Sequence, residues 1–296
     1  MLRILLTGGS GFIGKNILEQ LGDRYSFLAP THHQVDLLSF NSVKKYFETK
    51  GPFDVVLHCA VVGGNRQTGD GKNFALDSLR MFENLSFFMY QFSWFFNFGS
   101  GIEYGKERPI KSFAENEFGQ LVPQNNWGLF KYSCAKLVEA NPNKFINLRL
   151  FGVFGKYEDY SIRFISNSIC KNIMGMPIII NKNVVYSYLY MDDLIKVVDF
   201  FLNNKPRFNV YNVTPSEKTD LLEIAKNINL ISQKPVPIKI RHRVLDNEYT
   251  GNNARLLKEM KNLSFTKIDD AISELYKWYM GRKNIIDKKK LIDDYF

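Results

Sequence analysis

The first fourteen residues hold the pattern that most constrains what this chain can fold into. An apolar run at residues 2–6 leads into glycines at positions 8, 11 and 14, and apolar residues then recur at helical spacing up to Leu21. In such a unit the first glycine permits a sharp turn, the second lets a pyrophosphate approach the backbone, and the third lets the helix pack closely on the strand. The diphosphate lies at the positive N-terminal end of the helix. The sequence therefore predicts the opening βα unit of a dinucleotide-binding fold, and the expected cofactor contacts in it are Thr7, Gly8, Ser10, Gly11, Phe12, Ile13 and Gly14.

The first half of the chain alternates short β-type runs with helical patterns. The runs cover residues 2–6, 25–29, 54–58, 94–98 and 145–150, and the helical patterns cover residues 12–21, 41–49, 73–91 and 126–139. This alternation is typical of a parallel sheet with helices on both faces. Ligands of such sheets bind beyond the carboxyl ends of the strands. We therefore predict an α/β fold with a Rossmann-type doubly wound parallel sheet, and a crevice where the segments after residues 6, 58, 98 and 150 converge.

Beyond about residue 155 the pattern is less regular. It predicts a helix at 162–174, a β-rich stretch at 178–190, and a helix at 192–203 and a strand at 209–213 that return to the main sheet. We divide the chain into a dinucleotide-binding domain (1–155), a mainly substrate-binding small C-terminal lobe (156–281) and a polar, peripheral tail (282–296).

Composition narrows the possible environments and partners. The formal net charge is +9, but the lysines are scattered and no nucleic-acid-binding motif accompanies them, so we expect no nucleic-acid partner. No apolar stretch reaches the roughly 20 residues that a membrane span needs. The cysteines, Cys59, Cys134 and Cys170, lack metal-ligand spacing, so we expect no metal site and a reducing, cytoplasmic location.

A series of segments in consistent order resembles the extended short-chain dehydrogenase/reductase family, in its nucleotide-sugar epimerase, dehydratase and reductase branch. Residues 7–14 match TGxxGxxG, 35–38 resemble its Asp-Leu segment, and 54–60 resemble the strand that ends at the cofactor. Residues 98–105 resemble the strand that carries the family's catalytic serine or threonine, and residues 127–131 resemble its YGxSK segment with changes. Residues 149–155 resemble its RPFNVYG strand, residues 188–194 resemble its FLYVDDL segment, and residues 211–213 match a further strand. The resemblance covers about residues 2–280 and includes the GDP-fucose synthase and dTDP-4-dehydrorhamnose reductase types of this family. It implies an NDP-sugar substrate, an NAD(P) cofactor and a homodimer.

The resemblance implies a catalytic serine at Ser100 and a tyrosine followed by a lysine four residues later. A neighbouring ammonium favours the phenolate and so prepares such a tyrosine for proton transfer. Here Lys131 fits the lysine position, but Trp127 occupies the tyrosine position, and an indole has no proton to titrate for this work.

Tyr132 and Lys136 form an alternative pair with the same spacing. Gly128 favours the Lys131 register, since the family also has glycine there. Lys131 also precedes Arg149 by 18 residues, against 13 for Lys136, which leaves more room for a full helix and turn. Five positions along a helix rotate a side chain by about 140°, so Tyr132 reaches the site of residue 127 only if the helix shifts. Both registers remain open at this point.

The residues next to Ser100 exclude some of the reactions that this family catalyses. Sugar 4,6-dehydratases carry an Asp-Glu pair just after this position, where this chain has Gly101 and Ile102. Ile102 also occupies the cysteine position of the GDP-fucose synthase type, and residues 155–170 hold no histidine. The remaining reactions are 4-keto reduction and 4-epimerisation of an NDP-sugar. A cofactor-binding sensor or scaffold without turnover is the alternative that Trp127 suggests.

Cofactor and substrate contacts complete the expected site. Residues 28–33, at the end of the second strand, hold no carboxylate to bind a ribose 2′-hydroxyl, and Thr31 could accommodate a 2′-phosphate, so we favour NADP over NAD. The resemblance assigns further cofactor contacts to Asp36, Leu37, Cys59, Ala60 and Lys131, and substrate contacts to Ser100 and Trp127. Arg163 is a candidate for the substrate diphosphate because its planar fork binds phosphate bidentately, or else it is a surface arginine. Tyr186 and Tyr188 either line the same cleft or pack in the core.

Overall fold

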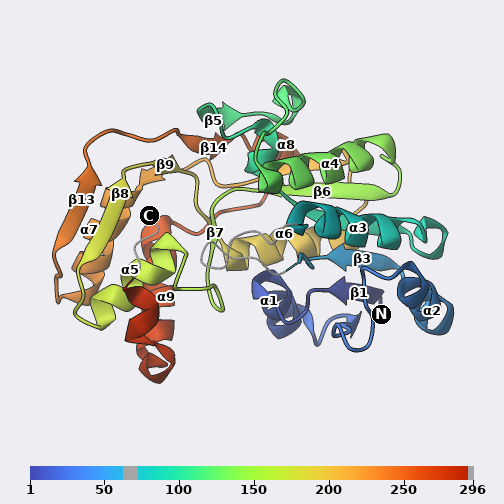
Figure 1. Cartoon of the computed structure of the whole chain (residues 1–296), viewed down its shortest axis with the longest axis horizontal. Helices are drawn as coiled ribbons and strands as arrows, with labels where there is room; N and C mark the ends of the chain where they lie inside the picture. The colour runs from blue at the N-terminus through green and yellow to red at the C-terminus, as the bar shows by residue number, and fades with distance from the viewer. Residues whose placement is uncertain (63–72, 293–296) are drawn as a thin grey trace.

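The computed structural model describes residues 1–62 and 73–292 of the chain. A six-stranded, wholly parallel sheet forms the core of the larger part of the molecule, on the right in Figure 1, where β1, β3 and β6 are labelled. Its strands, in spatial order, are β11 (Val210–Val213), β6 (Phe145–Leu150), β4 (Trp94–Ser100), β3 (Val55–His58), β1 (Arg3–Thr7) and β2 (Ser26–Leu28). Because β2 and β3 flank β1 on opposite sides, the winding of the chain reverses at β1 and opens a crevice at the carboxyl ends of β1 and β3. The predicted doubly wound α/β class is confirmed.

Helices cover both faces of this sheet. The helices α1 (Phe12–Leu21) and α6 (Met191–Asn203) lie on one face, and α2 (Phe40–Lys50), α3 (Phe74–Ser86) and α4 (Asn126–Ala140) lie on the other. Successive strand residues enter opposite cores: Ile4 and Leu6 pack with α1, whereas Leu5 packs toward α2. Continuous apolar runs are thus buried on both sides, as strands of a covered parallel sheet require.

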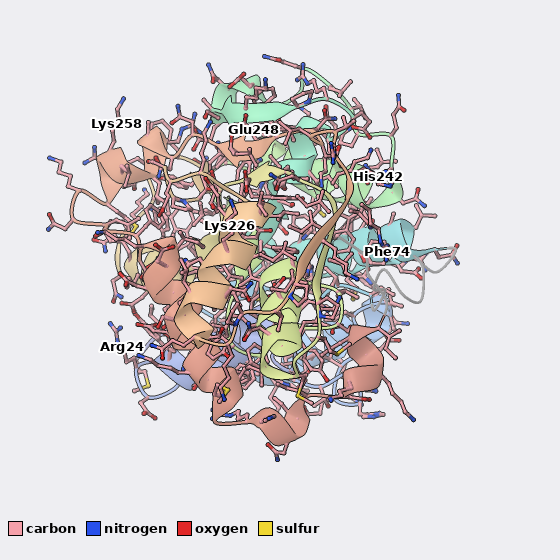
Figure 2. The ribbon with its side chains drawn as sticks, turned by 90° about the vertical axis from the view of Figure 1, so that its left-hand side faces the viewer. Arg24, Phe74, Lys226, His242, Glu248 and Lys258 are labelled. Atoms are coloured by element: carbon pink, nitrogen blue, oxygen red, sulfur yellow. The ribbon has the colours of Figure 1, made fainter. Side chains whose placement is uncertain are left out.

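The C-terminal lobe has its own core between three helices and a two-stranded sheet. The helices are α5 (Phe164–Ile173), α7 (Leu221–Ser232) and α9 (Ile268–Met280), and β8 (Ile178–Lys182) pairs in parallel with β13 (Ile238–His242). Figure 2 shows this lobe from its outer side, with α7, which carries the labelled Lys226, toward the viewer.

Two small sheets and several short helices complete the described residues. One small sheet has the order β12 (Thr219–Asp220), β9 (Val185–Tyr186), β14 (Tyr249–Gly251) and β5 (Ile110–Phe113), and the other pairs β10 (Leu189–Tyr190) with β7 (Val153–Phe154). The remaining helix is α8 (Ala254–Glu259), and the 3-10 turns are η1 (Met89–Gln91), η2 (Gly101–Tyr104), η3 (Glu115–Glu117), η4 (Lys283–Ile285) and η5 (Lys288–Leu291).

Most expected elements occur where the pattern predicts them, with two corrections. The return of α6 and β11 to the central sheet is confirmed, since β11 pairs with β6 and α6 packs beside α1. The helix expected over 73–91 ends at Ser86, and residues 89–91 form η1 instead. The expectation of a peripheral tail is wrong for Ile286 and Leu291, which are buried in the lobe core because the turns η4 and η5 fold these apolar side chains inward. Residues 293–296 of that tail lie outside the described residues.

A buried ion pair joins the carboxyl ends of three strands. The Arg149 Nε on β6 donates to Glu103 Oε2 in η2 at 2.7 Å, and both side chains are fully buried. Asn147 Nδ2 donates to the same carboxylate oxygen at 2.9 Å. Arg149 Nη1 donates to the Tyr104 hydroxyl at 2.7 Å, and that hydroxyl donates to Asn212 Oδ1 on β11 at 2.9 Å. The pair and its hydrogen bonds therefore hold the turn after β4 against β6 and β11.

The buried end of the chain gives a first prediction. Leu291→Ala should lower the free energy of unfolding by about 2–5 kcal/mol, because it empties a fully buried site in the lobe core. The matched change Ile292→Ala, one residue later at a side chain that is 65% exposed, should leave stability nearly unchanged. Urea unfolding of both variants measures the difference, and equal losses would contradict the docking of η5.

The ion pair gives a second prediction. Arg149→Met should lower the free energy of unfolding by about 3–5 kcal/mol, because it leaves the Glu103 carboxylate buried without its partner. The double variant Glu103→Gln/Arg149→Met should lose less than the sum of the two single variants. Lys136→Met, which removes an exposed pair with Glu139, serves as the control and should change stability by less than about 1 kcal/mol. Additive losses in urea unfolding would mean that the two groups do not act as a pair.

Candidate functional site

The glycine turn after β1 leaves no room for side chains. Gly8 has φ +72°, and a Cβ there would lie 2.7 Å from the Ala60 amide nitrogen of the segment that follows β3. A Cβ at Gly14 would overlap the carbonyl oxygen of Gly8. Bare backbone therefore lines the carboxyl end of β1, as a bound diphosphate needs.

The N-terminus of α1 suits an anion. Its N-cap residue is Gly11, and among the described residues no side chain caps this helix end or places an acidic group in its first turn. Ser10 and Gly11 are exposed beside it, whereas Phe12 and Ile13 pack against the core. Amide groups at the positive end of a helix, without a competing carboxylate, bind phosphate. The residues present thus fit the diphosphate of a dinucleotide.

The end of β3 lies directly beside the glycine turn. Thr7 Oγ1 and His58 Nδ1 are 2.8 Å apart, and the Ala60 amide is 3.4 Å from Thr7 Oγ1. Burial, together with the charge of Lys131, lowers the pKa of His58 to about 3, so this imidazole is neutral at physiological pH. Burial also raises the pKa of the neighbouring Cys59 thiol, which keeps it protonated. This strand end is thus an uncharged wall of the crevice.

Residues of the loop after β2 form hydrogen bonds with one another. The Thr31 amide donates to Gln34 Oε1 at 2.8 Å, and the rings of His32 and His33 have centroids 3.8 Å apart. Asp36 Oδ1 accepts from the Leu38 amide at 2.9 Å. The carbonyl of Leu37 accepts from Asn84 of α3 at 2.8 Å. Asp36 and Leu37 therefore fix the shape of the loop on which the expected adenine contacts lie.

Lys131 projects from α4 toward the end of β4. Its Nζ donates to the carbonyl oxygen of Phe98 at 2.7 Å, and the side chain is buried. Burial lowers the pKa of this ammonium, while Cys134, Glu103 and Cys59 act in the opposite direction. The charge of Lys131 acts to lower the pKa of both His58 and Cys59, the residues at the end of β3.

Trp127 lies one helical turn before Lys131. Its ring stacks on Phe74 at the start of α3, with centroids 4.8 Å apart, and the Lys131 Nζ is 5.8 Å from the indole centroid. Both residues are on the side of α4 that packs toward α3 and β4. The tryptophan and the buried lysine are thus neighbours, but the tryptophan offers no titratable hydroxyl.

Tyr132 and Lys136 lie in a different environment. The Tyr132 ring packs on Phe118, with centroids 4.9 Å apart, and the Lys136 Nζ lies over both rings. Lys136 pairs with Glu139 at 2.9 Å, and its side chain is 47% exposed. Of the two candidate lysines, Lys131 is the one directed at β4.

Ser100 ends β4 and caps η2. Its amide donates to Glu103 Oε1 at 2.8 Å, and its Oγ accepts from the Ile102 amide at 3.4 Å. The Oγ also lies 3.1 Å from the hydroxyl of Tyr249 on β14. Sequence reasoning did not identify Tyr249. It lies 149 residues beyond Ser100, and nothing in a single sequence pairs the two residues.

A pocket of about 500 Å³ opens between β7, the start of α5 and the strands of the lobe. Arg163, the N-cap residue of α5, lines it, as do Tyr186, Tyr188, Lys106, Glu158 and His242. The Lys106 Nζ lies 3.4 Å from the Tyr186 hydroxyl. The structure thus brings Arg163 and both tyrosines to one pocket, while Tyr186 and Tyr188 also pack against the lobe core. Lys106, Glu158 and His242 were missed because they come from separate loops and strands without a shared motif.

Glu158 is a buried carboxyl in the wall of this pocket. The hydroxyl of Ser166 donates to Glu158 Oε2 at 2.6 Å. Burial raises the pKa of Glu158 to about 7, although Arg163 and the Ser166 hydrogen bond act to lower it. The pocket therefore changes charge near neutral pH.

Within residues 1–62 and 73–292, no group of three metal-ligating side chains is gathered in one place. In the same residues no helix combines the length and the apolar character that crossing a membrane requires.

Glu158 makes stability depend on pH in a definite direction. Its folded pKa of about 7 exceeds its usual 4.5, so its contribution to stability is fully present below pH 4.5 and is lost as pH rises through 7. Glu158→Gln should therefore flatten the fall in Tm between pH 5 and 8, measured by calorimetry. The exposed carboxylate change Glu139→Gln should retain the wild-type slope. A slope unchanged in Glu158→Gln would contradict the shifted pKa.

Comparisons with known proteins agree with this geometry. The chain is 23% identical to the GDP-L-colitose synthase of Yersinia pseudotuberculosis, over 96% of this chain and 99% of that protein. Among solved structures, it resembles an NADP-bound GDP-L-fucose synthetase from Naegleria fowleri, with TM-score 0.80, 17% identity and coverage of 96% of this chain and 94% of the other. It also resembles an NADP-bound GDP-mannoheptose C4 reductase from Campylobacter jejuni, with TM-score 0.79, 17% identity and coverage of 94% and 98%.

A family model decides the assignment. The model of the NAD dependent epimerase/dehydratase family matches residues 4–214, which contain the glycine turn, the end of β4 and the buried lysine of α4. This match covers well over half of the chain, and it agrees with the sheet order and with the cofactor crevice. The chain therefore belongs to the NAD dependent epimerase/dehydratase family.

Proposed function

We propose that this protein is an NAD(P)-dependent reductase of an NDP-linked 4-keto-hexose. The observation that carries the proposal is the placement of Ser100 and Lys131: Ser100 ends β4, and the Lys131 Nζ donates to the Phe98 carbonyl two residues earlier on the same strand. A nicotinamide bound in the cofactor crevice would supply the hydride. Ser100 would donate its hydroxyl hydrogen to the sugar oxygen at C4, and the buried ammonium of Lys131 would favour negative charge developing beside it.

The residues suit reduction better than epimerisation. Epimerisation at C4 needs a group that first removes a proton from the 4-hydroxyl and later returns one. Trp127 cannot do this, because an indole does not titrate in the working range. Reduction adds a hydride at C4 and needs one proton at the oxygen, with none to remove first; Ser100 would hydrogen-bond this oxygen, and solvent water would supply the proton. The similar proteins named as a C4 reductase and as colitose and fucose synthases support this choice.

The pocket in the lobe supports an NDP-sugar as substrate. Arg163 and Lys106 would bind the diphosphate, since an arginine fork matches phosphate oxygens and a lysine adds charge. Tyr186 and Tyr188 would offer ring surfaces to the nucleoside. The proteins of known structure cited above carry GDP in their names, so GDP-linked sugars are the first substrates to test.

For the cofactor we propose NADP rather than NAD. The loop at residues 28–33 has no carboxylate to oppose a 2′-phosphate, and the Thr31 hydroxyl lies on that loop. Phe12, Ile13 and Gly14 would present their amides to the diphosphate, while Cys59, Ala60 and Lys131 would lie along the nicotinamide half. Similar structures with NADP and with NAD both exist, so the preference requires its own measurement.

Two further expectations remain proposals. A homodimer through α3 and α4 would cover the exposed apolar side chains Leu76 and Leu129. A cytoplasmic location would suit the thiols of Cys59, Cys134 and Cys170, none of which is in a disulfide.

The second candidate function is a cofactor-binding protein without turnover. Trp127 favours this second function, because it occupies the position where the family has its catalytic tyrosine. The two candidates differ in one observable, since only the reductase consumes NADPH.

The test follows NADPH absorbance with GDP-, dTDP- and UDP-linked 4-keto-hexoses. We expect oxidation of NADPH, slower oxidation of NADH, and a fall in kcat of about 100-fold or more in Ser100→Ala. Lys131→Met should also lose activity strongly. Lys136→Met should stay within about twofold of the wild type, because its ammonium forms only an exposed pair.

Two results would contradict the proposal. NADPH binding by calorimetry without oxidation for any sugar would support the sensor or scaffold instead. Loss of activity in Lys136→Met but not in Lys131→Met would show that Tyr132 and Lys136 are the catalytic pair.

A further inference from the structure

Tyr249 reaches the reaction site from a strand that the family model does not cover. It lies on β14, which pairs in parallel with β5 through Ile110 and with β9 through Tyr186. Its side chain is buried, with ring contacts to Phe151 at 5.2 Å and to Tyr186 at 5.7 Å. Its hydroxyl is directed at the Oγ of Ser100, 3.1 Å away.

Gly101 makes room for this arrangement. A Cβ at that position would lie 2.8 Å from the Tyr249 hydroxyl and 2.5 Å from the Phe151 ring. In the sequence, Gly101 indicates only that the chain lacks the acidic pair of sugar 4,6-dehydratases. In the structure, the absence of a side chain at Gly101 allows a tyrosine of β14 to approach the end of β4.

We propose that Tyr249 is the positioning residue for Ser100: its hydroxyl donates to Ser100 Oγ and so directs the serine hydrogen at the substrate oxygen. The inference rests on the proposed reduction. Ser100 Oγ has two lone pairs and one hydrogen. The Ile102 amide donates to this oxygen at 3.4 Å, and the Tyr249 hydroxyl lies 3.1 Å away, where either hydroxyl can donate to the other. With Tyr249 as the donor both acceptor sites of the serine are used, and its hydrogen is left for the sugar oxygen.

The surroundings of Tyr249 keep its own hydrogen in place. Burial, the largest influence, raises the pKa of this phenol and so keeps it protonated. The titratable groups around Tyr249 are Glu103 of η2, Tyr186 of β9 and Lys106, whose ammonium lies 5.3 Å from the Tyr249 ring centroid. The phenol therefore remains a donor at physiological pH.

This arrangement also explains how a site with Trp127 can still work. Trp127 supplies no hydroxyl from α4, whereas Tyr249 brings one to Ser100 from β14. Tyr249 would not replace the proton donor of the family, because it would act through the serine that its hydroxyl contacts. Its role would be to orient the Ser100 hydroxyl toward the sugar oxygen.

The experiment is a double-mutant cycle on NADPH oxidation with the best NDP-4-keto-hexose. Tyr249→Phe keeps the ring and removes the hydroxyl, and it should lower kcat by about 10- to 100-fold with little change in KM or in the Kd for NADPH. The variant Ser100→Ala/Tyr249→Phe should be no slower than Ser100→Ala alone, because Tyr249 acts only through that serine. Tyr25→Phe is the matched control, since Tyr25 is also a buried tyrosine whose hydroxyl donates to a side chain, Asp199.

A second variant, with difluorotyrosine at position 249, retains the ring and the hydroxyl. Its phenol is more acidic than that of tyrosine, so its kcat should fall at alkaline pH, where the fluorinated phenol loses the hydrogen that it donates. A purely structural role for Tyr249 would not produce this fall.

The outcomes separate the two proposals. No oxidation of NADPH by the wild type with any sugar would overturn the reductase and this inference together. A wild type that works, with Tyr249→Phe within about twofold of it, would overturn only the role of Tyr249. Additive losses in the double variant, or no alkaline fall with difluorotyrosine, would likewise reject positioning through Ser100.

Discussion

The buried ion pair between Glu103 and Arg149 is the interaction on which the rest of the site depends. Glu103 lies in the turn that follows β4, and Arg149 lies on β6. One carboxylate oxygen of Glu103 accepts from Arg149 and the other from the Ser100 amide. The charges are fully buried, so leaving either one unpaired is expensive in free energy. The position of the serine at the end of β4 is thus fixed by the same contacts that hold three strands together.

The site combines an uncharged crevice with a charged pocket. His58 and Cys59 are neutral beside the glycine turn, so Lys131 is the ammonium directed at this end of the crevice. The pocket in the lobe instead collects Arg163, Lys106 and the titrating Glu158. This separation suits a reaction whose charge changes occur at one oxygen, while the charged part of the substrate is held elsewhere.

The sequence predicted the fold and the cofactor crevice well, and the reaction centre less well. Short-range patterns carry the first set: the glycines at 8, 11 and 14, the residues of α1, and the runs that became β1, β3 and β4. Spacing favours Lys131 but leaves Lys136 open, because both lie on the same helix and only the packing of that helix directs Lys131 at Phe98. The burial of Leu291 is not predictable from its polar neighbours for a similar reason, since it depends on a core built by α5, α7 and α9.

The sequence by itself determined that the turn after β1 is bare backbone and that α4 carries Trp127 where the family resemblance implies a tyrosine. Both are local facts, set by residue type and by spacing of a few positions. The tertiary structure alone decided which side chains meet Ser100. Tyr249 arrives from another strand and lobe, through space that Gly101 leaves open, and Glu103 is held by an arginine on β6. Contacts between residues so far apart in the chain arise only when the sheet and the lobe pack together, because no local preference encodes them.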